Sequence, residues 1–163
     1  MVTRRALFGA GALTLLAGCG PPEETEVDAA EVLTRQLRAE QAVFATQQAI
    51  GDDDLSIPDN WRSQTLLEGT RSRIVKLQDA LSAAGAAVPA PEAGPATASL
   101  EVLLAAERRA LRVHVEALGE LRDPKWSELF GELISGSAAH ETALLKLLER
   151  PPLPSAFPGQ PVA

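Results

Sequence analysis

The residues of this chain that could do chemistry are a few carboxylates and both of its histidines, set into otherwise apolar lines. Glu40 and Glu107 each interrupt a line of leucines at helical spacing, and His114 and His140 do the same. Carboxylate oxygens and imidazole nitrogens are ligands for iron, manganese and zinc. Glu40, Glu107 and His140, with Glu68 at the flank of another line, are therefore candidate ligands of a single metal ion.

The apolar lines repeat at alternating steps of three and four residues, which is the periodicity of helix faces buried in a bundle. They are Leu33, Leu37, Glu40 and Phe44; Leu67, Thr70, Ile74, Leu77 and Leu81; Leu100, Leu104, Glu107, Leu111, His114, Leu118 and Leu121; and Trp126, Leu129, Leu133, Ser137, His140, Leu144 and Leu147. We therefore expect both histidines and two of the carboxylates to face the core.

Capping and breaking residues divide the chain into four predicted helices. The predicted ranges are Asp28 to Ile50, Trp61 to Ala84, Ser99 to Leu121 and Pro124 to Arg150, with Asp28, Ser99 or Thr97, and Asp123 as N-caps and with Gly51, Gly85 and Pro151 as stops. Leucine and alanine, which favour helices, dominate the apolar residues, and the chain has no tyrosine and only four phenylalanines. The sequence predicts an all-α domain.

The connection from 86 to 97 decides the topology of the bundle. Its prolines prevent a helix, and a dozen extended residues at roughly 3.3 Å each can travel about 40 Å, the length of a helix of this size. The other two connections are shorter and favour antiparallel hairpins. We predict a four-helix bundle over residues 28–150, built as two antiparallel hairpins joined by a long crossover.

Placing the two helices of each predicted hairpin antiparallel about their loop shows which polar residues lie at the same level along the bundle. Glu107 then lies beside His140, and Glu40 lies beside Arg71. The crossover brings these four residues into one buried charge layer. Such a layer needs a cation, because a buried carboxylate loses its hydration.

This arrangement resembles the di-iron carboxylate proteins of the ferritin-like superfamily, in which two helices carry one Glu each and two carry Glu-x-x-His. Glu40 and Glu107 match the single glutamates, while 137–140 and 68–71 stand where the Glu-x-x-His pairs would be. The chain is similar to ferritin-like domains of exported proteins from high-GC Gram-positive bacteria, many of undefined function. The resemblance implies a ferritin-like fold over residues 28–150.

Two departures from the family pattern argue against a di-iron site. Ser137 replaces a bridging carboxylate, and Arg71 replaces a histidine ligand. A guanidinium stays protonated and cannot bind a metal, but it can pair with Glu40 or Glu107. We therefore predict that an arginine and a histidine balance the charges that metals would otherwise balance, with no catalytic residue and no cofactor.

Two interpretations of this layer stay open. In one, Glu107 and His140 form a buried pair in an inherited core. In the other, Glu40, Glu107 and His140, together with Glu68, hold one iron, manganese or zinc ion. We expect His114 to lie one layer away as a hydrogen-bonded core histidine, near Glu132 or Leu133.

Residues 1–18 have the pattern of an export signal, with a basic start at Arg4 and Arg5 and an apolar segment too short to span a bilayer. The sequence from Leu16 to Cys19 resembles a bacterial lipobox, which implies diacylglycerol on Cys19, the chain's only cysteine. The arginine pair also resembles a twin-arginine signal, with general secretory export as the alternative. We predict a lipid anchor on the extracytoplasmic face of the cell membrane.

The exported part is acidic. Removing residues 1–18 changes the formal net charge from −7 to −9, which disfavours nucleic acids and anionic headgroups as partners. Prolines and glutamates in 19–27 predict a solvated tether behind the lipid, and five prolines in 151–163 predict a disordered tail.

Three functions remain compatible with the sequence: a non-catalytic tethered bundle that binds a protein or small ligand, a metal-binding or ferroxidase-like protein with a reduced site, and an architectural spacer. The sequence names neither a partner nor an oligomeric state.

Overall fold

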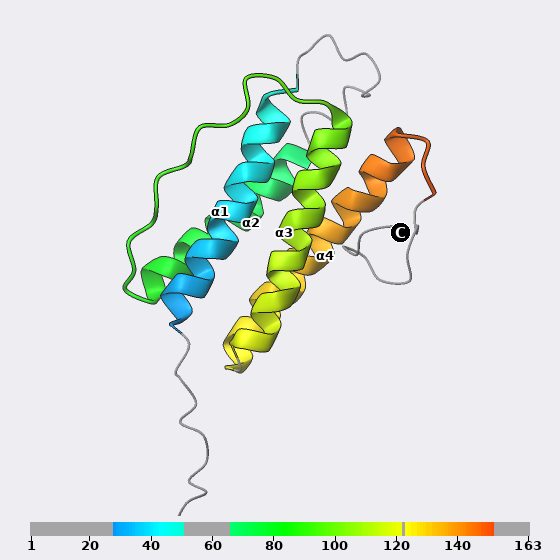
Figure 1. Cartoon of the computed structure of the whole chain (residues 1–163). Helices are drawn as coiled ribbons and strands as arrows, with labels where there is room; N and C mark the ends of the chain where they lie inside the picture. Colours follow the sequence, from blue (N-terminus) through cyan, green and yellow to red (C-terminus); the bar gives the residue numbers. More distant parts are fainter. Residues whose placement is uncertain (1–27, 51–65, 122, 152–163) are drawn as a thin grey trace, which may run out of the picture.

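The computed structural model describes residues 28–50, 66–121 and 123–151 (Figure 1). These residues form four helices and no strand: α1 (Ala29–Gln48), α2 (Leu67–Ala83), α3 (Leu100–Glu120) and α4 (Pro124–Leu147). The all-α prediction is therefore confirmed. The predicted export signal, tether, tail and first turns of the second helix lie outside the described residues.

The ends of α1, α3 and α4 lie within three residues of the predicted ends, and α2 ends at Ala83, one residue before the predicted Ala84. Asp28 Oδ1 accepts a hydrogen bond from the Ala30 amide at 2.9 Å, and Asp123 Oδ1 accepts one from the Lys125 amide at 3.1 Å. Ser99 caps α3 in the same way, through the Val102 amide at 3.4 Å. Gly85, with φ +71, follows α2, where a left-handed residue commonly ends a helix.

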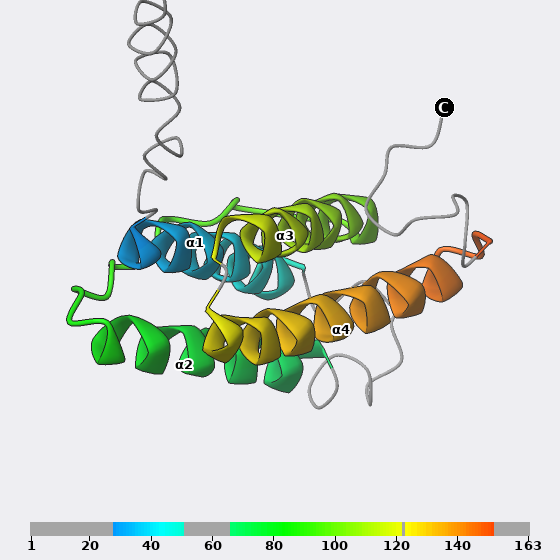
Figure 2. The same ribbon diagram turned by 90° about the horizontal axis from the view of Figure 1, so that it is seen from below.

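The four helices lie in two layers, with α1 beside α3 and α2 beside α4 (Figure 2). Within each hairpin, α1 with α2 and α3 with α4, the helices run antiparallel (Figure 1). The chain then returns along the length of α1 before α3 begins, so that α2 and α3 run in the same direction (Figure 1). The seam between α2 and α4 has the least contact of the four neighbouring pairs.

The returning segment, residues 86–98, is called the crossover below, and α1 holds it at three places. Gln41 Nε2 donates to the Pro89 carbonyl at 3.4 Å, and the Ala98 amide donates to the Ala49 carbonyl at 3.0 Å. Between these bonds, Gly94 lies so close to α1 that a Cβ on it would be 2.7 Å from the Ala45 Cβ. The crossover therefore packs along α1 as an ordered strap.

The buried apolar residues of the described chain, apart from Leu111, form two separate clusters. One contains Val32, Leu33, Leu37, Leu77, Leu81, Ala117, Leu121, Phe130 and Leu133. The other contains Val43, Leu66, Leu100, Leu103, Leu104, Ala110, Leu144 and Leu145. Buried polar side chains lie along the same helices between these two sets. Over the described ranges, no helix has the length and apolar character needed to cross a membrane.

Candidate functional site

Each helix contributes two buried polar side chains to the region between the apolar clusters. They are Gln36 and Glu40 from α1, Thr70 and Arg73 from α2, Glu107 and His114 from α3, and Ser137 and His140 from α4. The spacings of three, four or seven residues place both members of each pair on one helix face. None of these eight residues, the polar layer, is more than 6% exposed.

The guanidinium of Arg73 joins carboxylates from two different helices. Its Nε lies 2.9 Å from Glu40 Oε2, and its Nη2 lies 3.4 Å from Glu107 Oε1. Nη2 also donates to Thr70 Oγ1 at 3.3 Å. The contact between Nε and Glu40 Oε2 is a close ion pair that is not aligned as a hydrogen bond. Neither of these two atoms therefore has a hydrogen-bond partner among the described residues, and the same is true of the second oxygen of Glu107, Oε2.

His114 lies between two acceptor oxygens of α1. Its Nδ1 is 2.6 Å from Gln36 Oε1, and its Nε2 is 2.7 Å from Glu40 Oε1. The Gln36 amide nitrogen donates to the Val113 carbonyl at 3.2 Å, which leaves the amide oxygen to face the histidine. Because both ring nitrogens face acceptors, the doubly protonated imidazolium satisfies both contacts. When doubly protonated, His114 is a second buried cation beside Glu40.

His140 lies on the other side of the guanidinium. Its Nδ1 is 2.8 Å from Glu107 Oε1 and 3.4 Å from Arg73 Nη2. We assign the proton to Nδ1, because the shortest contact of this nitrogen is to Glu107 Oε1, an acceptor, to which Nδ1 then donates. Glu107 Oε1 is thus shared by the histidine and the arginine.

Two glycines make room for these side chains at the seam between α2 and α4. A Cβ on Gly69 would lie 2.8 Å from His140 Nε2, and a Cβ on Gly136 would lie 3.1 Å from the Arg73 side chain. Glycine costs a helix interior stability relative to alanine, so its presence at both positions fits the need for space.

The charges of the polar layer compensate one another. Burial alone would raise the pKa of Glu40. The hydrogen bond from His114 and the charges of Arg73 and His114 together lower this pKa by more than burial raises it, so the net shift is downward. Glu40 is therefore ionised at neutral pH. Two buried carboxylates, Glu40 and Glu107, thus face the guanidinium of Arg73, and Glu40 also faces the imidazole of His114.

The structure brings together Glu40, Glu107 and His140 but not the other two predicted residues of the site. Arg71 is exposed, with its guanidinium 5.3 Å from the centre of the Phe44 ring, and Glu68 is also exposed. The placement of Arg71 in the buried layer was wrong, because Arg73 occupies that position.

The reason for this correction is the phase of α2. Leu66, Thr70, Arg73 and Leu77 follow one another at steps of four, three and four, and all four are buried. Arg71 lies two residues before Arg73, which turns it roughly 200° around the helix. The sequence already contained this signal, because Arg73 stands at helical spacing from Leu66 and Leu77, two leucines of the buried face.

His114 is the second correction. It was expected one layer away, near Glu132 or Leu133, but it hydrogen-bonds to Glu40 and Gln36 within the polar layer. Folding hairpins at their loops compares only helices of the same hairpin. It could not detect the packing of α3 across α1, which places His114 beside Glu40.

The polar layer does not fit a metal ion while Arg73 remains in it. The guanidinium contacts Glu40, Glu107 and His140, which are the same three residues that would ligate the metal. A guanidinium offers no lone pair to a metal and repels a second cation. Within the described parts of the chain, no three His, Cys, Asp or Glu side chains form a group that could hold a metal.

Comparison with known proteins adds no relative: no protein-family model, curated protein or solved structure matches this chain. The functional argument therefore depends on the geometry of the polar layer and on the sequence motifs.

Replacing Gly69 with alanine should destabilise the fold by about 1–2 kcal/mol, because the new Cβ displaces His140 from its bond to Glu107. Gly131→Ala is the matched control, because a Cβ there meets nothing within 4 Å. The control should gain about 0.5–1 kcal/mol from helix propensity. Urea unfolding followed by circular dichroism measures both; equal gains for the two variants would contradict the crowded seam.

Replacing Glu40 with glutamine should cost about 3 kcal/mol at pH 7, because it leaves Arg73 and His114 without one carboxylate. The pKa of Glu40 is lowered in the folded state, so its contribution is present above the ordinary value of 4.5 and is lost as pH falls through the folded pKa. The stability difference between wild type and variant should therefore shrink below about pH 4.5. Ser137 and Gln36, which also face this part of the layer, do not titrate.

Denaturant unfolding from pH 7 downward measures this convergence, over the pH range in which both proteins remain folded. Glu116→Gln, an exposed change of the same type on α3, is the control and should stay within about 0.5 kcal/mol of wild type throughout. A Glu40→Gln penalty that is independent of pH would show that Glu40 is not an ionised partner.

Proposed function

We propose that this chain is a lipid-anchored extracytoplasmic protein with a degenerate ferritin-like bundle, in which an internal ion-pair network has replaced the metal centre. Its role is then non-catalytic, as a binding or structural module at the cell membrane. The observation that carries the proposal is the position of Arg73, whose guanidinium contacts both Glu40 and Glu107.

The arrangement of the helices supports the ferritin-like part of the proposal. Two antiparallel hairpins joined by a crossover along the bundle are the arrangement of that superfamily (Figure 1). The inward Glu40 and Glu107 lie on the first helix of each hairpin, and the second helices supply Arg73 and His140. Each helix thus contributes to one central cluster, as in the di-iron proteins.

The closure of the polar layer supports a non-catalytic role. Glu40, Glu107 and His114 are fully buried, and Arg73 and His140 are each 6% exposed. Enzyme sites are concave and open to their substrates. No substrate could reach these carboxylates without separating the helices, and the carboxylates are already engaged with cations.

A reduced metal site is the second candidate function, and one observation favours it. Glu107 Oε2 is buried without a hydrogen-bond partner among the residues described, which is the state of a carboxylate oxygen available to an ion, and Glu40 Oε2 has only its ion pair with Arg73. With His140 they would supply three ligands once Arg73 had moved away. Glu68 would not join them, because its side chain is exposed on α2.

Metal content of the full chain distinguishes the two candidates. Wild type, loaded with Fe(II), Mn(II) or Zn(II) and desalted, should retain well under one ion per chain by mass spectrometry. Arg73→His should gain about one Zn(II), because it removes the competing cation and adds a ligand beside Glu40, Glu107 and His140.

Arg71→His is the matched control, since it makes the same change on the same helix but outside the polar layer, and it should bind no metal. About one ion in wild type, lost in Glu107→Ala, would establish the reduced metal site instead. About two ions per chain would restore a di-iron centre and overturn the proposal.

Lipid attachment is tested separately. In a bacterial host fed a labelled fatty acid, wild type should incorporate the label, and Cys19→Ser should incorporate none, because Cys19 is the chain's only thiol. Label in the serine variant would contradict the lipobox interpretation. Changing both Arg4 and Arg5 to lysine keeps the charge; loss of export would then identify the twin-arginine route, and unchanged export the general secretory route.

A further inference from the structure

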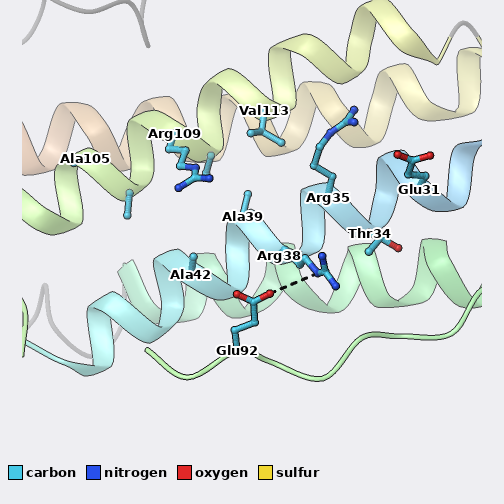
Figure 3. Close-up of a pocket in the computed structure, with 12 residues that line it drawn as sticks. Glu31, Thr34, Arg35, Arg38, Ala39, Ala42, Glu92, Ala105, Arg109 and Val113 are labelled. Atoms are coloured by element: carbon cyan, nitrogen blue, oxygen red, sulfur yellow. Dashed lines mark ion pairs between the residues drawn. The ribbon is translucent and has the colours of Figure 1, made fainter. Parts of the chain in front are cut away.

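A groove of about 710 Å³ is lined by side chains of α1 and α3 and by Glu92 of the crossover (Figure 3). Its apolar lining is made of short side chains: Ala39, Ala42, Ala105, Ala106, Ala110 and Val113. Small-molecule sites in proteins typically have volumes of about 300–1,000 Å³ and a mostly apolar lining. The size and the lining of this groove both fit that class.

The walls of the groove carry three arginines, although the chain as a whole has a net charge of −7. Arg35 is engaged with Glu120, at 2.5 and 2.6 Å to its two oxygens. Arg38 lies 3.8 Å from Glu92, a loose ion pair in which both side chains are more than half exposed. Arg109 projects from α3 toward α1 and has no partner in the described part of the chain (Figure 3).

The acidic residues of the groove lie at its edges. Glu31 is near the start of α1, and Glu92 lies on the crossover, facing Arg38 (Figure 3). The crossover is fixed to α1 on both sides of Glu92, through Pro89 and Ala98. Glu92 therefore holds a fixed place at the edge of the groove, beside Arg38. The volume and the short apolar side chains of the lining favour a small ligand over a helix of a partner protein.

We propose that this groove binds a small organic anion, a single carboxylate carried on an apolar body. The carboxylate pairs with the guanidinium of Arg109, whose fork geometry suits bidentate contact with two oxygens. The apolar body lies on the alanines, and Arg38, which is only loosely paired with Glu92, adds positive charge along the opposite wall. Glu31 and Glu92 disfavour a second acidic group at either edge.

This site is independent of the polar layer, because none of its residues belongs to that layer. It names the class of ligand for the binding role proposed above, and it can fail while that role stands. The test therefore uses variants of the groove alone.

The probe is 4-(trifluoromethyl)benzoate, observed by ¹⁹F NMR with the full chain in zwitterionic nanodiscs and with empty nanodiscs as the blank. Wild type should bind it saturably, and the neutral isostere 4-(trifluoromethyl)benzamide should bind at least tenfold more weakly. Arg109→Gln should weaken benzoate binding about tenfold, because a charge-assisted contact is lost. Glu92→Gln should strengthen it about two- to threefold by releasing Arg38.

Arg71→Gln is the matched control, because it removes one exposed arginine from α2, outside the groove, and it should leave binding unchanged. Circular dichroism confirms that each variant is folded. The proposal is overturned if wild type does not bind benzoate up to millimolar concentration. Equal binding of the benzamide, or equal losses in the Arg109 and Arg71 variants, would also overturn it.

Discussion

The burial of one arginine between two glutamates is the constraint to which the rest of this bundle is fitted. A carboxylate or guanidinium taken out of water loses several kcal/mol of hydration, which is recovered only if its partners are held in place. Arg73 on α2 contacts Glu40 on α1 and Glu107 on α3, and His140 on α4 donates to the same Glu107 oxygen. Each helix therefore supplies a group without which another helix would carry an uncompensated charge.

This dependence fixes how the helices align along the bundle more strictly than the leucines do. Apolar side chains on a helix face tolerate a shift of one turn, since one leucine can replace another in the same hole. A shift of α2 by about 5.4 Å, one helical turn, would instead separate Arg73 from both carboxylates and leave its buried charge unpaired. We infer that the polar layer selects one alignment, while the two apolar clusters beside it supply most of the favourable burial. Gly69 and Gly136 follow from the same constraint, because the arginine and the histidine need the space that a Cβ would fill.

Much of this could be read from the sequence, since it depends on local rules. The caps Asp28, Ser99 and Asp123 and the proline-rich crossover marked the ends of the helices, and the interrupted leucine lines marked Glu40, Glu107 and both histidines as inward. Arg73 was missed because the predicted apolar line of the second helix used Leu67 and Ile74, one residue away from the positions that are buried, Leu66 and Arg73. The partner of His114 depends on how α3 crosses α1, which no single helix or hairpin encodes. The groove was not foreseen at all, since alanines in a helix give no sign that they line a surface hollow.

The same energetic argument separates the interior from the surface as places for function. A buried network whose charges compensate one another has little affinity left for a ligand, because any newcomer must first break an existing ion pair. A surface arginine without an ion-pair partner can bind a ligand without breaking an existing ion pair. Arg109 keeps its hydration and has no partner among the described residues, so an incoming carboxylate gains a contact without displacing one. The core of this bundle, whose charges compensate one another, therefore serves as a support. The place on the bundle that suits ligand binding is the groove between α1 and α3, where Arg109 lies beside an apolar hollow.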